Sequence, residues 1–336
     1  MIEPAAEIRA ALTQMGLAGA QGDFAMKQLD GGVSCDVFVV DLPGRRVCVK
    51  RALSKLRVEA DWHAPAKRAE AEVAWIRLVA GIDPQWVPAI LGEDRARHLF
   101  VMEFLPPENH PVWKSLLAEG RIDADFAAKV GAALARIHAE TAGRADVAAA
   151  FASDAQFHAL RIEPYLLHTA SNNPDMAAPI RAMANGVASA RIALMHGDVS
   201  PKNILCAPHG PVFLDAECAC YGDPAFDLAF CLNHLLLKGA WHPEHGDALA
   251  AAFVALKSAY FKGAIWEARD ALDRRVAGLL SALLLARIDG KSPAEYLTDA
   301  HVKSFVRAQA KLSLADPAPT LDSLLDRWTA ALSARA

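Results

Sequence analysis

The feature that most constrains this chain is a polar run, HGDVSPKN, that lies between apolar segments. It places Asp198 and Asn203 five positions apart, and the apolar run VFL then leads to Asp215 and Glu217. A Pro/Gly turn at 208–211 separates two short apolar runs, which predicts a loop, a strand, a turn and a second strand. Such a hairpin would bring Asp215 back to Asp198, seventeen positions earlier in the chain.

These residue types fit the needs of phosphoryl transfer. A carboxylate such as Asp198 can accept or orient the proton of an attacking hydroxyl, while an amide and a second carboxylate hold Mg²⁺ against nucleotide phosphates. Hard oxygen ligands suit Mg²⁺, and the phosphates fill its remaining positions. The pattern predicts Asp198 as the catalytic residue and Asn203 and Asp215 as metal ligands. The alternative, a capped turn made by Asp and Asn, is disfavoured by Asp215 on the next strand.

The stretch resembles the catalytic loop of the aminoglycoside phosphotransferase and choline kinase superfamily, which shares the protein-kinase fold. That loop, HGD with an Asn five residues after the Asp, matches at His196, Gly197, Asp198 and Asn203. The metal-binding Asp of the family, on the following strand, matches Asp215. The resemblance implies ATP and Mg²⁺ as cofactors and a small-molecule hydroxyl as the acceptor.

The resemblance continues downstream and covers roughly residues 25–235. It implies that Asp227 begins a buried helix and braces the catalytic loop, and that His196 is structural rather than a base. Asp215 and Glu217 form an Asp-x-Glu motif that is similar to the one in the methylthioribose kinase branch. In that branch the acidic third residue of the motif, here Glu217, can also reach magnesium. Lys202 would either approach the γ-phosphate or be solvated.

The implied fold is α+β and bilobal, with a β-rich nucleotide-binding lobe over 1–105 and a helical lobe over 106–336 that carries the acceptor site. The residue pattern agrees. The β-branched runs at 37–40 and 46–50, joined by DLPG, predict a hairpin. After LPP at 105–107 the chain is rich in Ala and Leu, and 125–139 predicts an amphipathic helix.

A kinase fold requires a lysine on the third strand and a glutamate on the next helix to pair with it. Lys50 ends the run RVCVK, and Glu70 and Glu72 follow in a helix expected over 65–80. Glu72 is preferred, because its apolar neighbours would face the core, but the choice between the two stays open.

Two further segments are expected to bind the nucleotide. LDGGVSCDVF supplies Gly31, Gly32 and Ser34 as a phosphate loop between two strands, although it is not a full GxGxxG. The strand HLFVMEF leads to the hinge between the lobes, where backbone groups of Glu103 and Leu105 would hydrogen-bond the adenine edge. Main-chain contacts of this kind do not distinguish ATP from GTP.

Charge, apolar runs and cysteine content limit the classes of partner and the locations that are expected for this chain. The formal net charge of -4 argues against nucleic acid, which would need a basic face. The most apolar run, 276–288, is shorter than the ~20 residues of a membrane helix and predicts a buried helix instead. The N-terminus lacks the apolar core of a signal peptide. Six cysteines without a CxxC pair predict neither disulfides nor zinc. A cytoplasmic protein without a membrane partner is expected, and its oligomeric state is left open.

The last hundred residues should form the acceptor site. From Lys238 to Ala336 there are 13 Lys or Arg and 11 Asp or Glu, a difference of +2. An aminoglycoside would favour an acidic pocket, so the balance favours a neutral or anionic metabolite such as a sugar or sugar-like alcohol. An aminoglycoside or choline-type acceptor remains the alternative, and an aromatic box for choline could draw on Trp241, Tyr260, Trp266 and Trp328.

The segment after 288 also predicts local structure. Ser292, Pro293 and Glu295 fit the N-cap, the first and the third positions of a helix, which is a capping box. Arg287 and Lys291 flank it and could reach a substrate phosphate or carboxylate.

Three rival functions stay in view. A protein kinase is disfavoured by HGD in place of HRD and by the lack of an activation segment ending in APE. A nucleotide-binding regulatory module without catalysis is disfavoured by the intact base, metal pair and lysine. A metal-dependent hydrolase would need a second histidine at ligand spacing.

Overall fold

The computed structural model describes residues 4–19, 24–29, 35–53 and 68–335. Its N-terminal part is an antiparallel sheet in the order β1-β2-β3-β5-β4. The strands are β1 (Ala25–Leu29), β2 (Cys35–Leu42), β3 (Arg45–Ala52), β4 (Ile90–Asp94) and β5 (Leu99–Glu103).

The predicted hairpin is confirmed and is longer than expected. Leu42 and Arg45 form the last pair of β2 and β3, so Pro43 and Gly44 make a two-residue turn. Gly44 has a φ of 78°, a conformation that favours glycine in such turns. The hairpin places Lys50 at the centre of the sheet, opposite Val37 and next to β5.

The two faces of the sheet pack against different helices. Successive side chains of a strand point to opposite faces. On one face, Val47 and Val49 of β3 pack with Ile8 and Leu12 of α1 (Pro4–Gln14). On the other face, Cys48 belongs to the main core together with α2 (Arg68–Ile82) and the helical part. The helix expected over 65–80 is thus observed from residue 68, since 65–67 lie outside the described residues.

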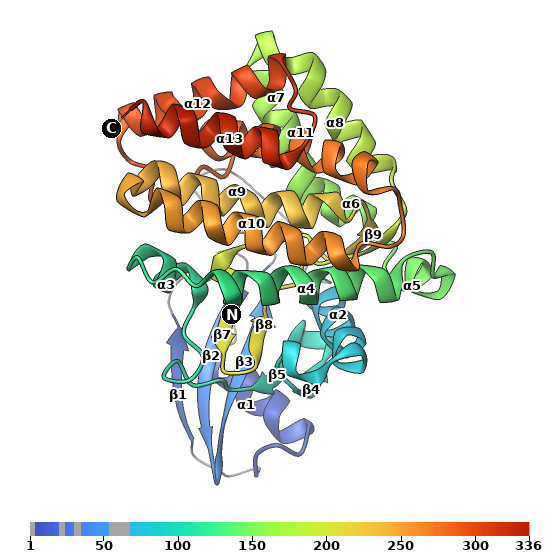
Figure 1. The fold of residues 1–336 in the computed structure, drawn as a ribbon. Coiled ribbons are helices and arrows are strands. Elements are labelled where there is room, and N and C mark those ends of the chain that lie inside the picture. Colours follow the sequence, from blue (N-terminus) through green and yellow to red (C-terminus); the bar gives the residue numbers. More distant parts are fainter. Residues whose placement is uncertain (1–3, 20–23, 30–34, 54–67, 336) are drawn as a thin grey trace.

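The rest of the chain is mainly helical (Figure 1). The α-helices are α3 (Trp113–Ala118), α4 (Ala124–Thr141), α5 (Ala145–Ala150), α6 (Asp154–Phe157), α7 (His168–Asn172), α8 (Ala177–Ser189), α9 (Ala225–Trp241), α10 (Gly246–Gly263), α11 (Arg269–Asp289), α12 (Ala300–Ala315) and α13 (Leu321–Ser333). A π-helix, η3 (His158–Leu167), joins α6 to α7.

Four short strands and several 3₁₀ turns complete the fold. The strands are β6 (Ala193–Met195), β7 (Ile204–Ala207), β8 (Gly210–Phe213) and β9 (Cys220–Gly222). The 3₁₀ turns are η1 (Pro84–Trp86), η2 (Arg95–Arg97), η4 (Pro174–Met176), η5 (Pro201–Asn203) and η6 (Pro243–His245). Two antiparallel pairs result, β6–β9 and β7–β8.

Helix α4, predicted over 125–139, is confirmed. The Asp123 carboxylate caps it by accepting from the N–H groups of Asp125 and Phe126, at 2.9 and 3.1 Å. In Figure 1 the helix runs between the sheet and the α9–α10 layer. Gly131 allows α10 to approach closely, because a Cβ there would lie 2.1 Å from the carbonyl oxygen of Leu256. This packing joins α4 to the α9–α10 layer.

The helix predicted to start at Ser292 is wrong. Residues 291–299 contain no helix, and α12 begins only at Ala300, capped by Asp299. Two competing contacts explain the difference. The carbonyl and hydroxyl of Ser292 accept from Arg287 at 2.5 and 3.3 Å, and Glu295 pairs with Lys114 instead of closing a capping box.

The apolar run at 276–288 lies in α11, where nearly every side chain is buried in the core, as expected. None of the helices in the described ranges is long and apolar enough to cross a membrane. All six cysteines are among the described residues, and no disulfide joins them. The sheet ends at Glu103 and the first helix after it begins at Trp113, but the division into lobes at residue 105 stays a prediction.

Candidate active site

The predicted loop, strand, turn and strand are all present. The loop that carries Asp198 lies between β6 and η5, and the β7–β8 hairpin follows it. The antiparallel hairpin returns the chain to its start, where the N–H of Leu214 donates to the carbonyl of Asn203 at 2.9 Å. As a result Asp198, Asn203 and Asp215 line the same cleft.

Asp227 at the start of α9 holds the backbone of the catalytic loop. Its two carboxylate oxygens accept from the N–H groups of His196 and Gly197, at 2.7 and 2.8 Å. The side chain is fully buried, and the ring of His138 lies 3.3 Å from it. Gly197 has a φ of 77°, and a Cβ there would lie 2.5 Å from the carbonyl oxygen of Cys218. The two hydrogen bonds accepted by Asp227 support the bracing role expected for it, and Gly197 lets the loop approach Cys218 closely.

His196 acts as a support for the loop. Its Nδ1 accepts from the N–H of Asp198 at 3.1 Å, and its Nε2 donates to the carbonyl of Leu214 at 3.0 Å. Trp75 of α2 packs edge-on against the ring at 4.8 Å. Burial lowers the pKa of His196, which favours the neutral ring that these two bonds require. Both ring nitrogens are engaged, in line with the structural role expected for His196.

The carboxylate of Asp198 is held by one of its two oxygens. Oδ2 accepts from the side-chain amide of Asn203 at 2.8 Å and lies 3.0 Å from Arg161 Nη2 and 3.3 Å from Lys202 Nζ. Across the parts of the chain that the structure describes, Oδ1 makes no hydrogen bond or ion pair. The arrangement fixes the carboxylate and leaves one oxygen for a ligand in the cleft.

Arg161 is a site residue that no sequence pattern singled out. It lies on the π-helix η3, a type of helix that is frequent at functional sites. Besides its contact with Asp198, it donates to the carbonyls of Gly197 at 2.6 Å and Leu160 at 2.7 Å. The residue is 6% exposed. One guanidinium thus fixes both the backbone and the carboxylate of the catalytic loop.

At the other end of the cleft, Lys50 lies between two carboxylates. It donates to both oxygens of Glu72, at 2.8 and 2.7 Å, and also contacts Asp215. Glu70 is only partly buried and is not the partner of Lys50. Burial alone would lower the pKa of Lys50, but the two carboxylates outweigh it and raise that pKa. The structure therefore pairs the predicted lysine with Glu72 of the two candidates.

Asp215 has an unusual backbone. Its φ of 66° is rare for a residue other than glycine, and such strain is concentrated at functional sites. Burial would raise its pKa, but the ammonium groups of Lys50 and Lys202 outweigh it and lower that pKa well below the usual value. Asp215 therefore presents a charged carboxylate to the cleft.

Glu217, the third predicted metal ligand, lies in a different environment. Its Oε2 accepts from Nε of the buried Arg68 at 2.8 Å, and the Cys35 thiol lies 3.7 Å from the same oxygen. The side chain still lines the cleft beside Asp215. A metal role for Glu217 stays a prediction.

These groups share one cleft of about 510 Å³. Glu103 and Leu105 line it on the side of β5, where the hinge was expected, and Tyr165 and Ser292 line its opposite end. The predicted phosphate loop, Gly31, Gly32 and Ser34, lies outside the described residues.

The donor set fits a magnesium ion that is completed by phosphates. Both bonds of the Asn203 amide nitrogen go to Asp198, so its oxygen is the atom left for a metal. Within the described ranges no three His, Cys, Asp or Glu side chains form a metal cage. An amide oxygen and one carboxylate match the way Mg²⁺ is held beside a nucleotide.

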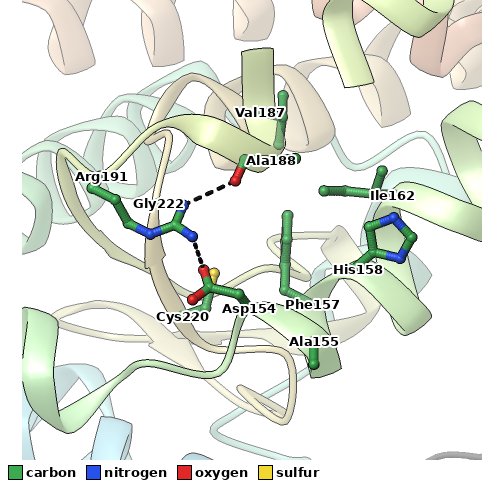
Figure 2. A pocket seen from close by; sticks show the side chains of 10 residues that line it. All are labelled: Asp154, Ala155, Phe157, His158, Ile162, Val187, Ala188, Arg191, Cys220 and Gly222. Carbon is green, nitrogen blue, oxygen red and sulfur yellow. Dashed lines mark hydrogen bonds and ion pairs between the residues drawn. The ribbon is translucent and has the colours of Figure 1, made fainter. Parts of the chain in front are cut away.

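A second, smaller pocket of about 270 Å³ is lined in part by His158 and Ile162 of the same π-helix (Figure 2). Its wall is mostly apolar and includes Phe157, Ile162 and Val187. Arg191 closes one side by pairing with Asp154 at 2.5 Å. This pocket has none of the predicted site residues.

Comparison with known proteins agrees with this geometry. Residues 25–272 match the model of the APH phosphotransferase enzyme family. Methylthioribose kinase 1 of Oryza sativa subsp. japonica is 24% identical over 258 residues, which span 69% of this chain and 60% of that relative. The chain thus spans about three fifths of this curated relative's length.

Solved structures show the same fold. Choline kinase from Cryptosporidium parvum Iowa II is 14% identical with a TM-score of 0.58, covering 96% of this chain and 99% of that one. Amicoumacin kinase hAmiN, in complex with AMP-PNP, Ca²⁺ and Ami, is 14% identical with a TM-score of 0.59, covering 95% and 98%. The predicted α+β, protein-kinase-like fold is confirmed, and this chain belongs to the phosphotransferase enzyme family.

Proposed function

We propose that the protein is an ATP-dependent kinase that transfers the γ-phosphate to a hydroxyl of a small molecule. One observation carries this proposal: a single cleft gathers Asp198, Asn203, Asp215 and the Lys50–Glu72 pair. These are the base, the metal ligands and the phosphate-binding lysine that phosphoryl transfer requires.

The nucleotide would lie between the sheet and the catalytic loop. The N–H of Glu103 already donates to the carbonyl of Ala89 at 2.8 Å, so its carbonyl is the group that can accept from the adenine amine. The N–H of Leu105, two residues on, would donate to the ring. Lys50 would turn from Asp215 to the phosphates, while Glu72 keeps it in place. Gly31, Gly32 and Ser34 are proposed to cover the phosphates.

Asn203 and Asp215 would hold magnesium, with Glu217 as a further ligand once Arg68 releases one of its oxygens. When bound, the ion neutralises charge on the phosphates. Because Asp215 is already ionised, no proton has to leave before the metal binds.

In the transfer step, the acceptor hydroxyl would lie against Asp198 Oδ1. This oxygen takes the proton while the hydroxyl oxygen attacks the γ-phosphorus. The bond from that phosphorus to the β,γ-bridging oxygen breaks, and its electron pair leaves with ADP. Arg161, Asn203 and Lys202 keep Oδ2 in place, so most of the rate enhancement comes from positioning and electrostatics.

The acceptor is proposed to be a sugar or a sugar-like alcohol. The curated relatives are named methylthioribose kinases, which phosphorylate a sugar by name. The solved neighbours are named for choline and for amicoumacin, so the fold does not choose among acceptors. A cytoplasmic location and the absence of a nucleic-acid partner stay predictions.

The test is magnesium-dependent ADP release with a panel of aminoglycosides, methylthioribose and other sugars, choline, ethanolamine and amino alcohols. Acceptor-stimulated release that disappears in Asp198→Asn is the expected result, and the active acceptor names the class. Tight ATP binding without stimulated release for any acceptor would favour the regulatory module. Absence of ATP binding would overturn the roles given to Lys50, Asn203 and Asp215 together.

A further inference from the structure

The end of the cleft beyond Asp198 is built around a buried arginine. Tyr165 and Ser292 line this end, and Arg287 of α11, which does not itself line the cleft, contacts both of them. Its Nη1 donates to the Tyr165 hydroxyl at 3.3 Å and to the Ser292 carbonyl at 2.5 Å. Arg287 therefore joins two residues of the cleft wall that come from η3 and from the 290–299 loop.

Two buried nitrogens in this region have no hydrogen-bond partner in the described parts of the chain. They are Nε of Arg287 and Nζ of Lys238 on α9. The two residues are 7% and 2% exposed. Buried polar groups are nearly always hydrogen-bonded, and an unpaired cation is costly to bury. Both nitrogens therefore have a hydrogen-bonding capacity that the described residues do not use.

The charges around this end do not cancel. The cations are Lys114, Arg161, Lys202, Lys238 and Arg287, and the facing carboxylates are Asp198 and Glu295. Five positive and two negative groups leave +3, not counting Asp215 and Glu217, which also face Lys202 and Arg161 but are paired with Lys50 and Arg68. Lys291 adds nothing to this sum, because it lies 3.8 Å from a carboxylate oxygen of Glu163.

Two titratable groups within the cluster register this excess. Burial, reinforced by Arg287, Lys238 and the other cations, lowers the pKa of His234 well below its usual value. Burial, reinforced by Lys114, lowers the pKa of Lys238 to about 8. His234 is therefore neutral near pH 7 and does not add to the positive charge.

The aromatic residues here are already occupied. The ammonium of Lys238 lies 4.9 Å from the ring centroid of Tyr296 and 5.4 Å from that of Trp241. This is the position that the cation of a quaternary ammonium ligand takes in an aromatic cage. A cationic acceptor would therefore compete with the protein's own lysine for these two rings.

We propose that the acceptor is an alcohol carrying a carboxylate or a phosphate ester, with that anionic group bound by Arg287 at the Tyr165–Ser292 end of the cleft. Lys238 and Lys202 add positive charge to the same cluster. The inference rests on the proposed kinase function and places the reacting hydroxyl at Asp198. A planar guanidinium suits both anions, because it can donate two parallel hydrogen bonds to either.

The test uses acceptors that share one carbon skeleton: a sugar alcohol, the matching sugar acid, the matching sugar phosphate and the matching amino sugar. We expect kcat/KM for the acid or the phosphate to exceed that of the neutral alcohol by about tenfold or more, because charge-assisted hydrogen bonds are the stronger ones. The amino sugar should be the poorest. The acid and the phosphate arms distinguish the two anions.

Variants assign the effect to Arg287. Arg287→Gln should lower kcat/KM for the anionic acceptor about tenfold or more and leave that of the neutral alcohol within about twofold. Arg287→Lys, which keeps the charge, should recover part of the loss if the variant folds. Arg307→Gln is the matched control, because Arg307 pairs with Asp289 at 2.7 Å outside the cleft. An equal loss for both acceptors in Arg287→Gln, or a neutral alcohol that matches the anions in the native protein, would show that Arg287 only supports the wall.

Calorimetric binding of the four compounds in the presence of AMP-PNP separates this inference from the proposed function. Anionic compounds that bind through Arg287 without being phosphorylated would uphold the inference and overturn the kinase proposal. Binding that does not distinguish the anions from the neutral alcohol would overturn the inference even if turnover is observed.

Discussion

The two ends of the cleft differ in how their charges are balanced. At the nucleotide end, Lys50 lies between Glu72 and Asp215, and Arg68 binds Glu217, so each cation has a carboxylate of the protein itself. At the proposed acceptor end, five cations face Asp198 and Glu295, while Asp215 and Glu217 are already paired with Lys50 and Arg68. The first end can exchange its own pairs for Mg²⁺ and phosphates at little net cost. The second end has an excess of positive charge that an anionic ligand would offset. We therefore expect this end to determine which acceptor is bound.

The largest expected effect is at the residue between the two ends. Asp198→Asn keeps the shape of the side chain but removes the proton acceptor, so kcat should fall by about 10²–10⁴-fold. The dissociation constant for ATP should change little, because Asp198 is not among the groups proposed to bind it. Steady-state kinetics with isothermal titration calorimetry checks both values. A variant with native kcat would contradict the mechanism.

The next largest effect is expected when the charge balance at the proposed nucleotide end is removed. Lys50→Met leaves Glu72, which is 1% exposed, without its cation, and removing one partner of a buried pair costs roughly 3–5 kcal/mol. We expect a lower midpoint of chemical unfolding as well as loss of activity. The double variant Lys50→Met/Glu72→Gln should regain much of the stability but none of the activity. Equal stability of the single and double variants would show that the pair is not coupled.

Replacing Arg161 tests whether this residue positions Asp198 between the two ends of the cleft. Arg161→Gln should lower kcat about tenfold or more with little change in KM for ATP, since it positions Asp198 rather than the nucleotide. Arg161→Lys should be intermediate, because an ammonium cannot make all three contacts. Arg191→Gln, at the second pocket (Figure 2), is the control and should keep native kinetics. A parallel rise in KM for ATP would point to general disruption instead.

The smallest effect concerns pH. His196 and His234 both have a folded-state pKa below the unfolded value of about 6.5. The unfolded chain then binds protons first, so the free energy of unfolding should fall as pH drops below about 6.5, by at most about 1.4 kcal/mol per pH unit for each group. Neighbouring carboxylates offset the shift of His196, whereas cations deepen that of His234.

Replacing His234 should therefore reduce the acid sensitivity more than replacing His196. Chemical unfolding of His234→Gln and His196→Gln at pH 7.5 and 5.5 gives the two slopes. If His196→Gln reduced the acid sensitivity of unfolding more than His234→Gln did, the comparison of charge at the two ends of the cleft would be wrong.

The sequence predicted the nucleotide end much better than the acceptor end, for a physical reason. Asp198, Asn203 and Asp215 lie in one stretch, and a single hairpin brings them together. Their local spacing therefore carries the information. The same holds for the β2–β3 hairpin and for helix α4, which rest on turn chemistry and on periodicity.

The residues that sequence reasoning missed reach the site from distant elements. Arg161, Arg68, Trp75 and His138 belong to no local motif, and only tertiary packing shows what they contact. The helix start predicted at Ser292 was wrong for the same reason, because Arg287 and Lys114 compete for the groups that would cap it. Local rules describe well the parts whose partners are near in sequence.

The most direct test of the account follows the phosphorus itself. ³¹P NMR of the protein with Mg²⁺, ATP and the acceptor panel should show ADP and a new phosphate monoester growing together, with both formed about 10²–10⁴-fold more slowly by Asp198→Asn. Inorganic phosphate as the only product, or a monoester that still forms at the native rate in Asp198→Asn, would contradict transfer to a hydroxyl held at Asp198.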